Sequence, residues 1–323
     1  MSASPCHRIL VTGASGFVGR HLQPALRAAF PQARLLAATR GERVAGWDEA
    51  IQLDLLAPDT CSTAIRTARP DAVIHLAALA GVGESFTNPL ASWRINLLGT
   101  LALGEAVRAE APEALFVHVS SAEVYGLAFQ SGQPLDEDAP MRPANPYAAS
   151  KAAADLAVGE MALRGLRAVR MRPFNHTGAG QSDAFVLPAF ARQVAMIAAG
   201  RQAPVLRVGA LDRWRDFLDV ADVCAGYVAV LRHAPALAAG AVFNLASGQP
   251  RRVGDILAEL LRMAGVTATI QPDEARLRPT DVLRTEGDAS AAGRALGWKP
   301  EIAWEETLGG VLRDWQHRIG GSV

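Results

Sequence analysis

A strand, a tight glycine turn and a helix follow one another near the start of the chain, in the segment RILVTGASGFVGRHL (residues 8–22). The turn contains Gly13, Gly16 and Gly19. In such a turn the first glycine lets the backbone bend sharply, the second removes a Cβ where a pyrophosphate must approach, and the third lets the helix pack on the strand. The amides and the dipole at the helix N-terminus favour an anion there. The segment therefore predicts a dinucleotide-binding β-α-β unit, although its spacing is G-x-x-G-x-x-G rather than G-x-G-x-x-G.

Short apolar runs alternate with longer helical patterns through the first half of the chain. The helical stretches include Leu98–Ala111 and Ser150–Arg164. This alternation predicts a parallel sheet that is covered by helices on both faces and joined by right-handed crossovers. The expected strands are Arg8–Thr12, Ala33–Thr39, Ile51–Leu53, Ala72–Leu76, Leu115–Val119 and Leu166–Arg172.

The pattern changes after about Pro173, where strands become shorter and Pro and Arg become denser. We expect residues 1–173 to form a Rossmann-type, doubly wound nucleotide-binding domain. Residues 174–323 should form mainly a smaller C-terminal α/β lobe for the substrate, while residues 216–250 return to the first domain. The strands expected after Pro173 are Val205–Val208, Val242–Ala246, which could rejoin the main sheet, and Thr267–Gln271.

Charge and cysteine content exclude several classes of function. Lys plus Arg and Asp plus Glu each number 32, so no overall field attracts nucleic acid or an anionic membrane. The segment MSASPCHR lacks the apolar region of a signal peptide, and no apolar run is long enough to cross a membrane, so we expect a cytoplasmic protein. Cys6, Cys61 and Cys224 lie far apart without a C-x-x-C pair, which argues against a disulfide framework or a metal site.

An arginine stands where the second strand should end. Folds that prefer NAD often place an acidic residue there to bond the ribose 2′-hydroxyl. This chain has Arg40, with Arg43 nearby. A cation at this position suits a 2′-phosphate, which predicts NADP(H) as the cofactor; an ordinary solvated arginine is the alternative.

Tyr147 and Lys151 form a Y-x-x-x-K pair in the segment NPYAASKAAADLA (residues 145–157). Residues four apart share one face of a helix. An ammonium group beside a phenol favours the phenolate, so we expect the pKa of Tyr147 to fall from about 10 towards neutral pH. A tyrosine tuned in this way can exchange a proton with a sugar oxygen during hydride transfer. Upstream, Ser120, Ser121 and Glu123 follow an expected strand, at the sheet edge where such folds bind ligands.

The glycine turn, the strand-end serine and the Y-x-x-x-K pair together resemble the extended short-chain dehydrogenase/reductase family. DAVIHLAA (residues 71–78) and RINLLGT (residues 94–100) also match, and the resemblance extends from about residue 8 to residue 315. It implies that Ser121, rather than Ser120, orients the substrate oxygen, because the family's hydroxyl lies four residues before the tyrosine of VYG. It further implies that Tyr147 is the general acid or base and that Lys151 tunes it and holds the nicotinamide ribose. The cofactor contacts that it implies are Gly13, Ser15, Gly16, Phe17, Gly19, Arg40, Asp54 and Leu55 (both at the adenine), Leu76, Ala77, Ala78, Asn96 (structural or in a proton relay), Tyr147 and Lys151.

The C-terminal half resembles the branch of that family that acts on GDP-6-deoxyhexoses, which contains GDP-mannose 4,6-dehydratases and GDP-4-keto-6-deoxy-D-mannose reductases. The matching segments are RPFNHTGAGQ, FVLPAFARQVA, RWRDFLDVADV and LRPTDVLR. Arginine makes charge-assisted bonds to a diphosphate, which a neutral protein must hold with local cations. The resemblance implies that the sugar nucleotide is held by Asn175, Val186 (at the guanine), Arg192, Arg215 and Arg278.

Two segments favour a reductase over a dehydratase. A dehydratase needs an extra acid and base, and the family supplies them directly after the active hydroxyl. Here that run is Ser121–Ala122–Glu123, and alanine transfers no proton. Glu123 matches the catalytic glutamate of the dehydratases, so a dehydratase remains an alternative. After Asn175 the chain continues as HTGAGQ and lacks the arginine pair that is typical of dehydratases. The expected reaction is NADPH-dependent reduction of GDP-4-keto-6-deoxy-D-mannose at C4 to GDP-D-rhamnose, with the C4 epimer GDP-6-deoxy-D-talose as the alternative product.

Other readings remain open on the sequence alone. A nucleotide-sugar epimerase would recycle its cofactor, and an NADP-binding regulator would keep the fold without turnover. His176 is more consistent with a positioned loop histidine than with a catalytic base, and we interpret His75 and His118 as satisfied core residues. In similar proteins the helices at residues 92–111 and 150–164 form a four-helix dimer interface, which implies a homodimer.

Overall fold

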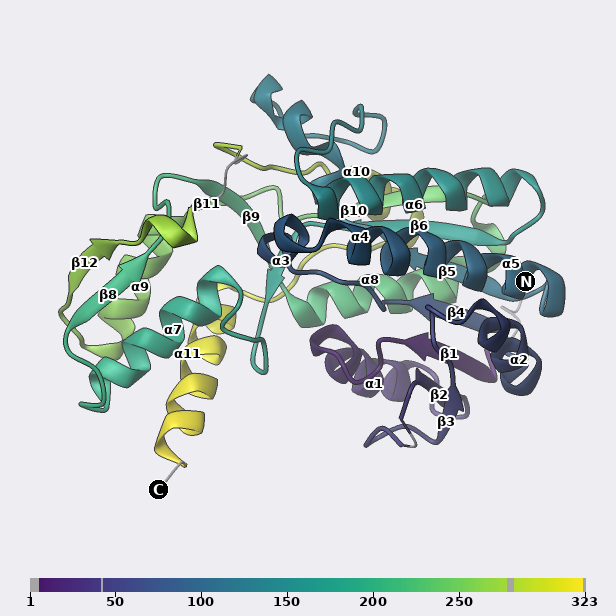
Figure 1. Cartoon of the computed structure of the whole chain (residues 1–323), viewed down its shortest axis with the longest axis horizontal. Coiled ribbons are helices and arrows are strands. Elements are labelled where there is room, and N and C mark those ends of the chain that lie inside the picture. Colours follow the sequence, from purple (N-terminus) through teal and green to yellow (C-terminus); the bar gives the residue numbers. More distant parts are fainter. Residues whose placement is uncertain (1–5, 42, 278–281, 322–323) are drawn as a thin grey trace.

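The computed structural model describes residues 6–41, 43–277 and 282–321, which form two adjacent lobes (Figure 1). The larger lobe contains a seven-stranded sheet in the order β10-β6-β5-β4-β1-β2-β3, and every pairing in it is parallel. This is the doubly wound Rossmann-type arrangement that the sequence predicts. Its strands are β1 (Arg8–Thr12), β2 (Arg34–Thr39), β3 (Glu49–Gln52), β4 (Ala72–His75), β5 (Leu115–Val119), β6 (Ala168–Pro173) and β10 (Ala241–Leu245).

Helices cover both faces of this sheet, so its strands are apolar on both sides. Along β1, Ile9 and Val11 pack into one core, whereas Leu10 packs into the other. Each such buried aliphatic side chain stabilises the fold by about 1.5–3 kcal/mol. The first core is covered by α1 (Phe17–Ala29), α8 (Val220–His233) and α10 (Ser290–Leu296), and the second by α2 (Pro58–Ala68), α5 (Thr100–Glu110) and α6 (Pro146–Leu163).

The segment that connects β5 and β6 carries all four predicted catalytic residues, and the segment that connects β4 and β5 packs beside it. The predicted helix at residues 98–111 is α5, which continues without a break from α4 and the π-helical turn η1. The predicted helix at residues 150–164 begins earlier, at Pro146, because the Asn145 side chain caps it by accepting the Ala148 amide at 2.8 Å. The remaining elements of this region are α3 (Val82–Thr87), α4 (Pro89–Ser92), η1 (Trp93–Gly99) and the 3₁₀ segment η2 (Ala122–Ser131).

The smaller lobe is built on two short sheets, β11-β9-β7 and β12-β8, with its own apolar core. The predicted strand at residues 205–208 is β8, and the one predicted at 267–271 is β12. The strand predicted at residues 242–246 is β10, which pairs with β6 in the large sheet. Sequence reasoning missed β7, β9 and β11. The elements of the smaller lobe are β7 (Asn175–Thr177), α7 (Val186–Ala198), β8 (Val205–Val208), β9 (Trp214–Asp219), β11 (Pro250–Arg252), α9 (Val253–Ala264), β12 (Thr269–Pro272), η4 (Glu274–Arg276) and α11 (Trp304–Gly320), whereas the short η3 (Ala234–Ala236) follows α8 in the larger lobe.

Two kinds of feature are absent from the described residues. None of the helices in this part of the chain has both the length and the apolar character needed to span a lipid bilayer. Within the same residues, no three His, Cys, Asp or Glu side chains are grouped so that they could hold a metal ion.

Candidate active site

The glycine turn between β1 and α1 leaves no room for side chains. Gly13 has φ +71°, and a Cβ built on it would lie 2.9 Å from the backbone nitrogen of Ala77. A Cβ on Gly19 would lie 2.5 Å from the carbonyl oxygens of Gly13 and Ala14. Gly16 directly precedes α1, whose first turn carries no acidic side chain. The turn is a bare backbone cradle at a helix N-terminus, which fits the pyrophosphate of a dinucleotide.

The end of β4 lies against this turn. Leu76, Ala77 and Ala78 follow β4 and are half-buried. The amide of Ala77 donates to Thr12 Oγ1 at 3.1 Å, and this hydroxyl lies 2.7 Å from His75 Nδ1. These bonds join the ends of β1 and β4 at the point where the strand order reverses, which is the place where such sheets bind ligands.

Three more predicted cofactor residues follow β2 and β3. Arg40 is exposed directly after β2, where its charge fits a 2′-phosphate. The Asp54 carboxylate accepts the Leu56 amide at 3.0 Å and so stabilises the turn after β3. Leu55 packs against the backbone of Gly99, where an added Cβ would lie 2.8 Å from the Leu55 Cβ. The two residues expected at the adenine therefore also hold this turn in place.

Asn96 is buried in η1, and its side chain is fully used within the protein. Its Oδ1 accepts the Leu79 amide at 2.8 Å, and its Nδ2 donates to the Leu79 carbonyl at 3.1 Å and to Ser150 Oγ at 3.0 Å. Asn96 thus holds the segment after β4 against α6. Single π-helical turns of this kind often occur at functional sites.

The start of α1 meets the residues that follow β6. Ser15 is exposed in the glycine turn, and the ring of Phe17 stacks on His176 with 6.3 Å between centroids. His176 Nδ1 donates to the Phe174 carbonyl at 3.0 Å, which agrees with a positioned loop histidine. Asn175, the neighbouring residue in β7, is exposed. Asn175, a predicted substrate residue, thus lies next to His176, which contacts α1 at the predicted cofactor site.

Ser121 and Tyr147 bring their hydroxyl groups together after the end of β5. Both side chains are buried. Burial raises the pKa of Tyr147 to about 12; the hydrogen bond with Ser121 opposes this rise, and the charge of Glu123 adds to it. The expectation that the pKa of Tyr147 falls towards neutral pH is therefore wrong for this arrangement, because the cost of burying a phenolate outweighs the stabilising contact.

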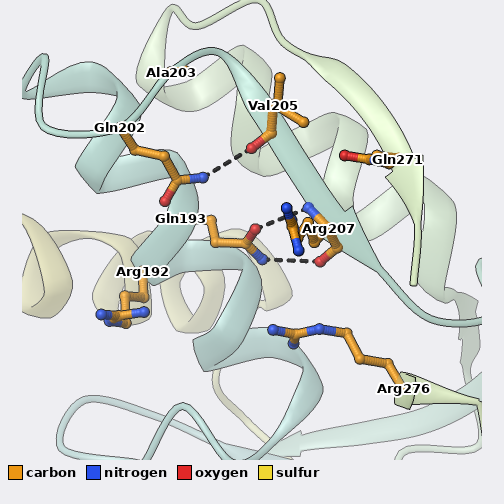
Figure 2. Close-up of a pocket in the computed structure, with 8 residues that line it drawn as sticks. All are labelled: Arg192, Gln193, Gln202, Ala203, Val205, Arg207, Gln271 and Arg276. Carbon is orange, nitrogen blue, oxygen red and sulfur yellow. Dashed lines mark hydrogen bonds between the residues drawn. The ribbon is translucent and has the colours of Figure 1, made fainter. Parts of the chain in front are cut away.

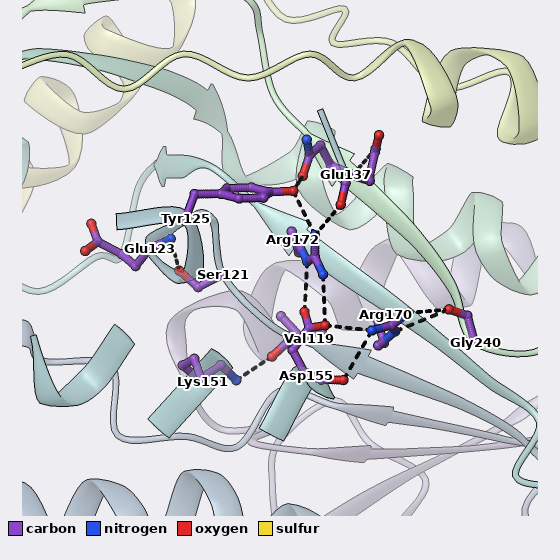
Figure 3. A network of polar contacts seen from close by, with 11 residues as sticks. Val119, Ser121, Glu123, Tyr125, Glu137, Lys151, Asp155, Arg170, Arg172 and Gly240 are labelled. Carbon is purple, nitrogen blue, oxygen red and sulfur yellow. Dashed lines mark hydrogen bonds and ion pairs between the residues drawn. The ribbon is translucent and has the colours of Figure 1, made fainter. Parts of the chain in front are cut away.

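Lys151 lies one helical turn after Tyr147 on α6 and points to the end of β5 (Figure 3). Its Nζ donates to the Val119 carbonyl at 2.5 Å. Burial lowers the pKa of Lys151 to about 8, and the negative charge of Asp155 partly opposes this effect. The ammonium group is thus held beside the edge of the sheet, and it starts to lose its proton just above neutral pH.

Glu123 is tied to the start of the helix that carries Tyr147. Its Oε2 accepts from Asn145 Nδ2 at 3.2 Å, and its amide donates to Ser121 Oγ at 3.2 Å. Asn145 also caps α6 through its Oδ1. These bonds favour a bracing role for Glu123. Sequence reasoning missed Asn145, although Asn-Pro at the start of an apolar run is a helix-start signal that could have identified it.

A buried ion-pair network lies beneath this edge of the sheet (Figure 3). Asp155 accepts from Arg172 Nε at 2.9 Å and from Arg170 Nη1 at 3.0 Å. Arg172 Nη1 donates to the Tyr125 hydroxyl at 3.0 Å, and that hydroxyl donates to Asn244 Oδ1 at 2.7 Å. Sequence reasoning missed this network because α6, β6, η2 and β10 meet only in the folded protein.

The two strand histidines differ in how they are satisfied. His75 contacts the hydroxyls of Thr12 and Thr100 at 2.7 and 2.9 Å, and burial, with a contribution from the Lys151 charge, lowers its pKa to about 3. Neither ring nitrogen of His118 has a hydrogen-bond partner within the described part of the chain. The prediction of a satisfied core residue is right for His75 and wrong for His118.

Arginines line an open pocket of about 460 Å³ in the smaller lobe (Figure 2). They are Arg192, which the sequence predicts, and Arg207 and Arg276, which sequence reasoning missed. Gln193 holds this wall together, since its Oε1 accepts the Arg207 amide at 2.9 Å and its Nε2 donates to the Arg207 carbonyl at 3.1 Å. Arg192 pairs with Asp183 at 3.5 Å and Arg276 with Asp273 at 3.1 Å, so an anionic ligand such as a phosphate would compete with these two carboxylates for the guanidinium groups.

Among the described residues, the predicted substrate residues Asn175, Val186 and Arg215 do not line this pocket. Val186 begins α7 and is 37% exposed. Arg215 is buried in β9, where its Nη1 donates to the Trp214 carbonyl at 2.8 Å. Arg278 lies outside the described residues. Of the four members of this set that the structure describes, Arg192 alone lies in the pocket.

Comparisons with known proteins relate the whole chain to one family. The sequence model of the family described as GDP-mannose 4,6 dehydratase matches residues 10–310. The GDP-6-deoxy-D-mannose reductase of Pseudomonas aeruginosa is 40% identical over 97% of this chain and 98% of that protein. A solved structure of RMD from Pseudomonas aeruginosa complexed with NADPH has a TM-score of 0.84 at 38% identity and covers 96% of this chain and 99% of that one.

A less similar protein has the same fold. The UDP-glucose 4-epimerase of Thermus thermophilus, solved with NAD, has a TM-score of 0.82 at 28% identity and covers 98% of this chain and all of that one. The family model spans most of the chain, and a 40% identical relative is covered almost completely. On this evidence the chain belongs to the GDP-mannose 4,6-dehydratase family.

Proposed function

We propose that this protein reduces the C4 ketone of GDP-4-keto-6-deoxy-D-mannose with NADPH and yields GDP-D-rhamnose. The observation that carries the proposal is the placement of Ser121 and Tyr147 together after the end of β5, with Lys151 one helical turn further along α6 and bonded to the end of that strand. The side chain between Ser121 and Glu123 is that of Ala122, which has no proton to transfer. The 40% identity with a protein named GDP-6-deoxy-D-mannose reductase supports the same reaction.

The residues at the sheet edge can supply what a ketone reduction needs from the protein. The glycine turn, Arg40 and Lys151 would hold NADPH, which would supply the hydride for C4. Ser121 Oγ orients the ketone oxygen through a hydrogen bond. The Tyr147 hydroxyl donates its proton to that oxygen, and a pKa of about 12 means that the proton is present at neutral pH.

The charge of Lys151 completes this arrangement. Proton donation leaves a phenolate on Tyr147, and a positive charge one helical turn away stabilises it. Lys151 carries this charge below its pKa of about 8. The proposed reaction therefore uses Tyr147 as an acid and Lys151 as a fixed cation.

A dehydratase is the second candidate, because Glu123 is present next to the site. Its carboxylate, however, bonds Asn145 at 3.2 Å and braces the start of α6. Elimination of water needs a second proton donor, and Ala122, the residue directly after Ser121, cannot donate a proton. These two observations favour simple reduction.

The deciding experiment mixes the protein with NADPH and GDP-4-keto-6-deoxy-D-mannose, follows cofactor oxidation and identifies the sugar by NMR. We expect consumption of NADPH and formation of GDP-D-rhamnose. GDP-6-deoxy-D-talose would show attack on the opposite face. A 4-keto product from GDP-mannose without added NADPH would indicate a dehydratase. Interconversion of two sugar nucleotides without net oxidation of NADPH would indicate an epimerase. NADPH binding without any turnover would leave a regulator as the function.

Arg40→Ala should raise the KM for NADPH by about tenfold or more and leave the KM for NADH unchanged. The expected loss follows from a charge-assisted bond to the 2′-phosphate, which is worth about 1.5–3 kcal/mol. Arg34→Ala is the matched control, because Arg34 lies at the other end of β2 and pairs with Glu49 at 3.0 Å. A preference for NADH in the unmodified protein that survives Arg40→Ala would contradict this role.

A homodimer is supported by exposed leucines on the helices next to the large sheet. Leu90 in α4, Leu98 in η1 and Leu156 and Leu163 in α6 are 65%, 55%, 60% and 89% exposed, and these helices pack together. Apolar side chains gathered on one such surface often mark an interface, and a two-fold dimer would bury them against their copies. Sedimentation equilibrium should give twice the chain mass; a monomer at micromolar concentration would contradict the proposal.

A further inference from the structure

Polar contacts hold the loop of residues 178–181, which follows β7, against helix α1. Arg20 Nη2 donates to the Gly180 carbonyl at 3.0 Å, while Arg20 Nη1 donates to the Ser15 carbonyl at 3.0 Å. In the next residue, His21 Nε2 donates to the Ala179 carbonyl at 2.8 Å. A single guanidinium therefore bridges the glycine turn of the large lobe and a loop that leads into the smaller lobe. We call Arg20, His21 and residues 178–181 the loop latch.

The latch is closed from the opposite side by α11 and by close packing. The Gly180 amide donates to Asp314 Oδ2 at 2.9 Å. A Cβ on Gly178 would lie 2.7 Å from Val220 Cγ1 and 3.7 Å from Phe17 Cζ. The loop thus fits against α1, α8 and α11 without space for a larger residue at position 178.

Internal bonds make the segment from β7 to the end of the loop one unit. Thr177 Oγ1 donates to Gln181 Oε1 at 2.7 Å, and Gln181 Nε2 donates to the His176 carbonyl at 3.1 Å. His176 also stacks on Phe17. Asn175, the exposed residue proposed to hold the sugar nucleotide, begins this unit. A shift of the loop would therefore be transmitted to Asn175.

We propose that Arg20 is a positioning residue that couples cofactor binding at the glycine turn to sugar-nucleotide binding at Asn175; this inference rests on the function proposed above. A ligand on the glycine turn fixes the Ser15 carbonyl, and Arg20, which bonds that carbonyl, then fixes the Gly180 carbonyl. The loop is thereby held in the conformation in which Asn175 can bind the sugar nucleotide. The first ligand to bind meets the entropic cost of ordering the loop latch, and the second ligand then binds without that cost. Such coupling is reciprocal, so each ligand tightens the binding of the other by the same factor.

Isothermal titration with GDP as the probe, with and without saturating NADP⁺, measures this coupling directly. In the unmodified protein NADP⁺ should lower the Kd of GDP by about fivefold or more. Arg20→Met keeps a long side chain but cannot donate to either carbonyl, and it should reduce that factor to less than about twofold. Arg20→Lys can reach one carbonyl at a time and should give an intermediate factor.

Arg27→Met is the matched control on the same helix, since Arg27 bonds the Ala33 carbonyl at 3.0 Å and Asp48 at 2.6 Å, away from the loop. It should keep the full coupling. Amide hydrogen exchange gives a readout that is independent of turnover: NADP⁺ should protect residues 175–181 in the unmodified protein and in Arg27→Met, but not in Arg20→Met.

The outcomes separate this inference from the proposed function. Coupling that persists in Arg20→Met, or that is absent in an unmodified protein which binds both ligands and turns over, would overturn the latch alone. An unmodified protein that binds no GDP would overturn the proposed function and the latch together. Melting curves of both methionine variants show whether each is folded, and Arg20→Lys carries the test if Arg20→Met is not.

Discussion

Tyr147→Phe should lower kcat by about 10²–10⁴-fold while changing the Kd of NADPH by less than about twofold. The substitution removes one oxygen and keeps the buried ring, so the packing at the start of α6 is preserved. It deletes the phenol that hydrogen-bonds Ser121, and the Ser121 hydroxyl is too weak an acid to replace it as the proton donor. Cofactor oxidation gives kcat, and quenching of protein fluorescence by NADPH gives the Kd.

Tyr227→Phe is the matched control for this prediction. Tyr227 is also fully buried, but within the described residues its hydroxyl has no hydrogen-bond partner. Removing that oxygen should therefore leave kcat close to its original value. Turnover by Tyr147→Phe within a few-fold of the unmodified protein would contradict the assignment of Tyr147 as the acid.

The large sheet could be predicted closely because its strands are continuous apolar runs. Leu115–Val119 is buried on both faces, and its bounds match the prediction. Strand β9 was missed because Arg215 and Asp216 interrupt its apolar pattern. The burial of Asp216 depends on partners distant in sequence, since its carboxylate accepts the amides of Ser247 and Gly248 at 2.8 and 2.9 Å. Those partners are not visible to a local pattern.

The candidate site was predictable in its members but not in its electrostatics. The spacing of Tyr147 and Lys151 places them on one helix face, as the structure shows. Spacing alone does not reveal that Lys151 Nζ bonds the Val119 carbonyl, or that burial controls the pKa of Tyr147. Both effects come from elements that meet α6 only in the folded protein, namely the end of β5 and the segments η1, η2 and β6 that pack on the helix. The pocket residues Arg207 and Arg276 were missed for the same reason, because β8 and η4 meet only in the folded lobe.

Asp155 is the residue on which the buried charges under the site depend. It lies on α6 one turn after Lys151 and is completely buried. Burial alone would raise its pKa, but the hydrogen bond and charge of Arg172, with the charge of Arg170, lower it overall. Because the folded-state pKa lies below the unfolded value, this pairing stabilises the protein above the unfolded pKa, and the contribution is lost as the pH falls through the folded-state pKa.

Asp155→Asn should lower the free energy of unfolding by about 3–5 kcal/mol at neutral pH, because it leaves Arg170 and Arg172 buried without their counter-charge. It should also move the alkaline limb of the kcat/KM profile to lower pH. Lys151 must be protonated to act as a cation, and the loss of the Asp155 charge lowers its pKa further below about 8. Urea unfolding and the pH–rate profile measure the two effects. Glu160→Gln, which removes an exposed partner of Arg164 on the same helix, should change neither appreciably. A variant that is destabilised but keeps its alkaline limb would show that Asp155 supports the fold without acting on Lys151.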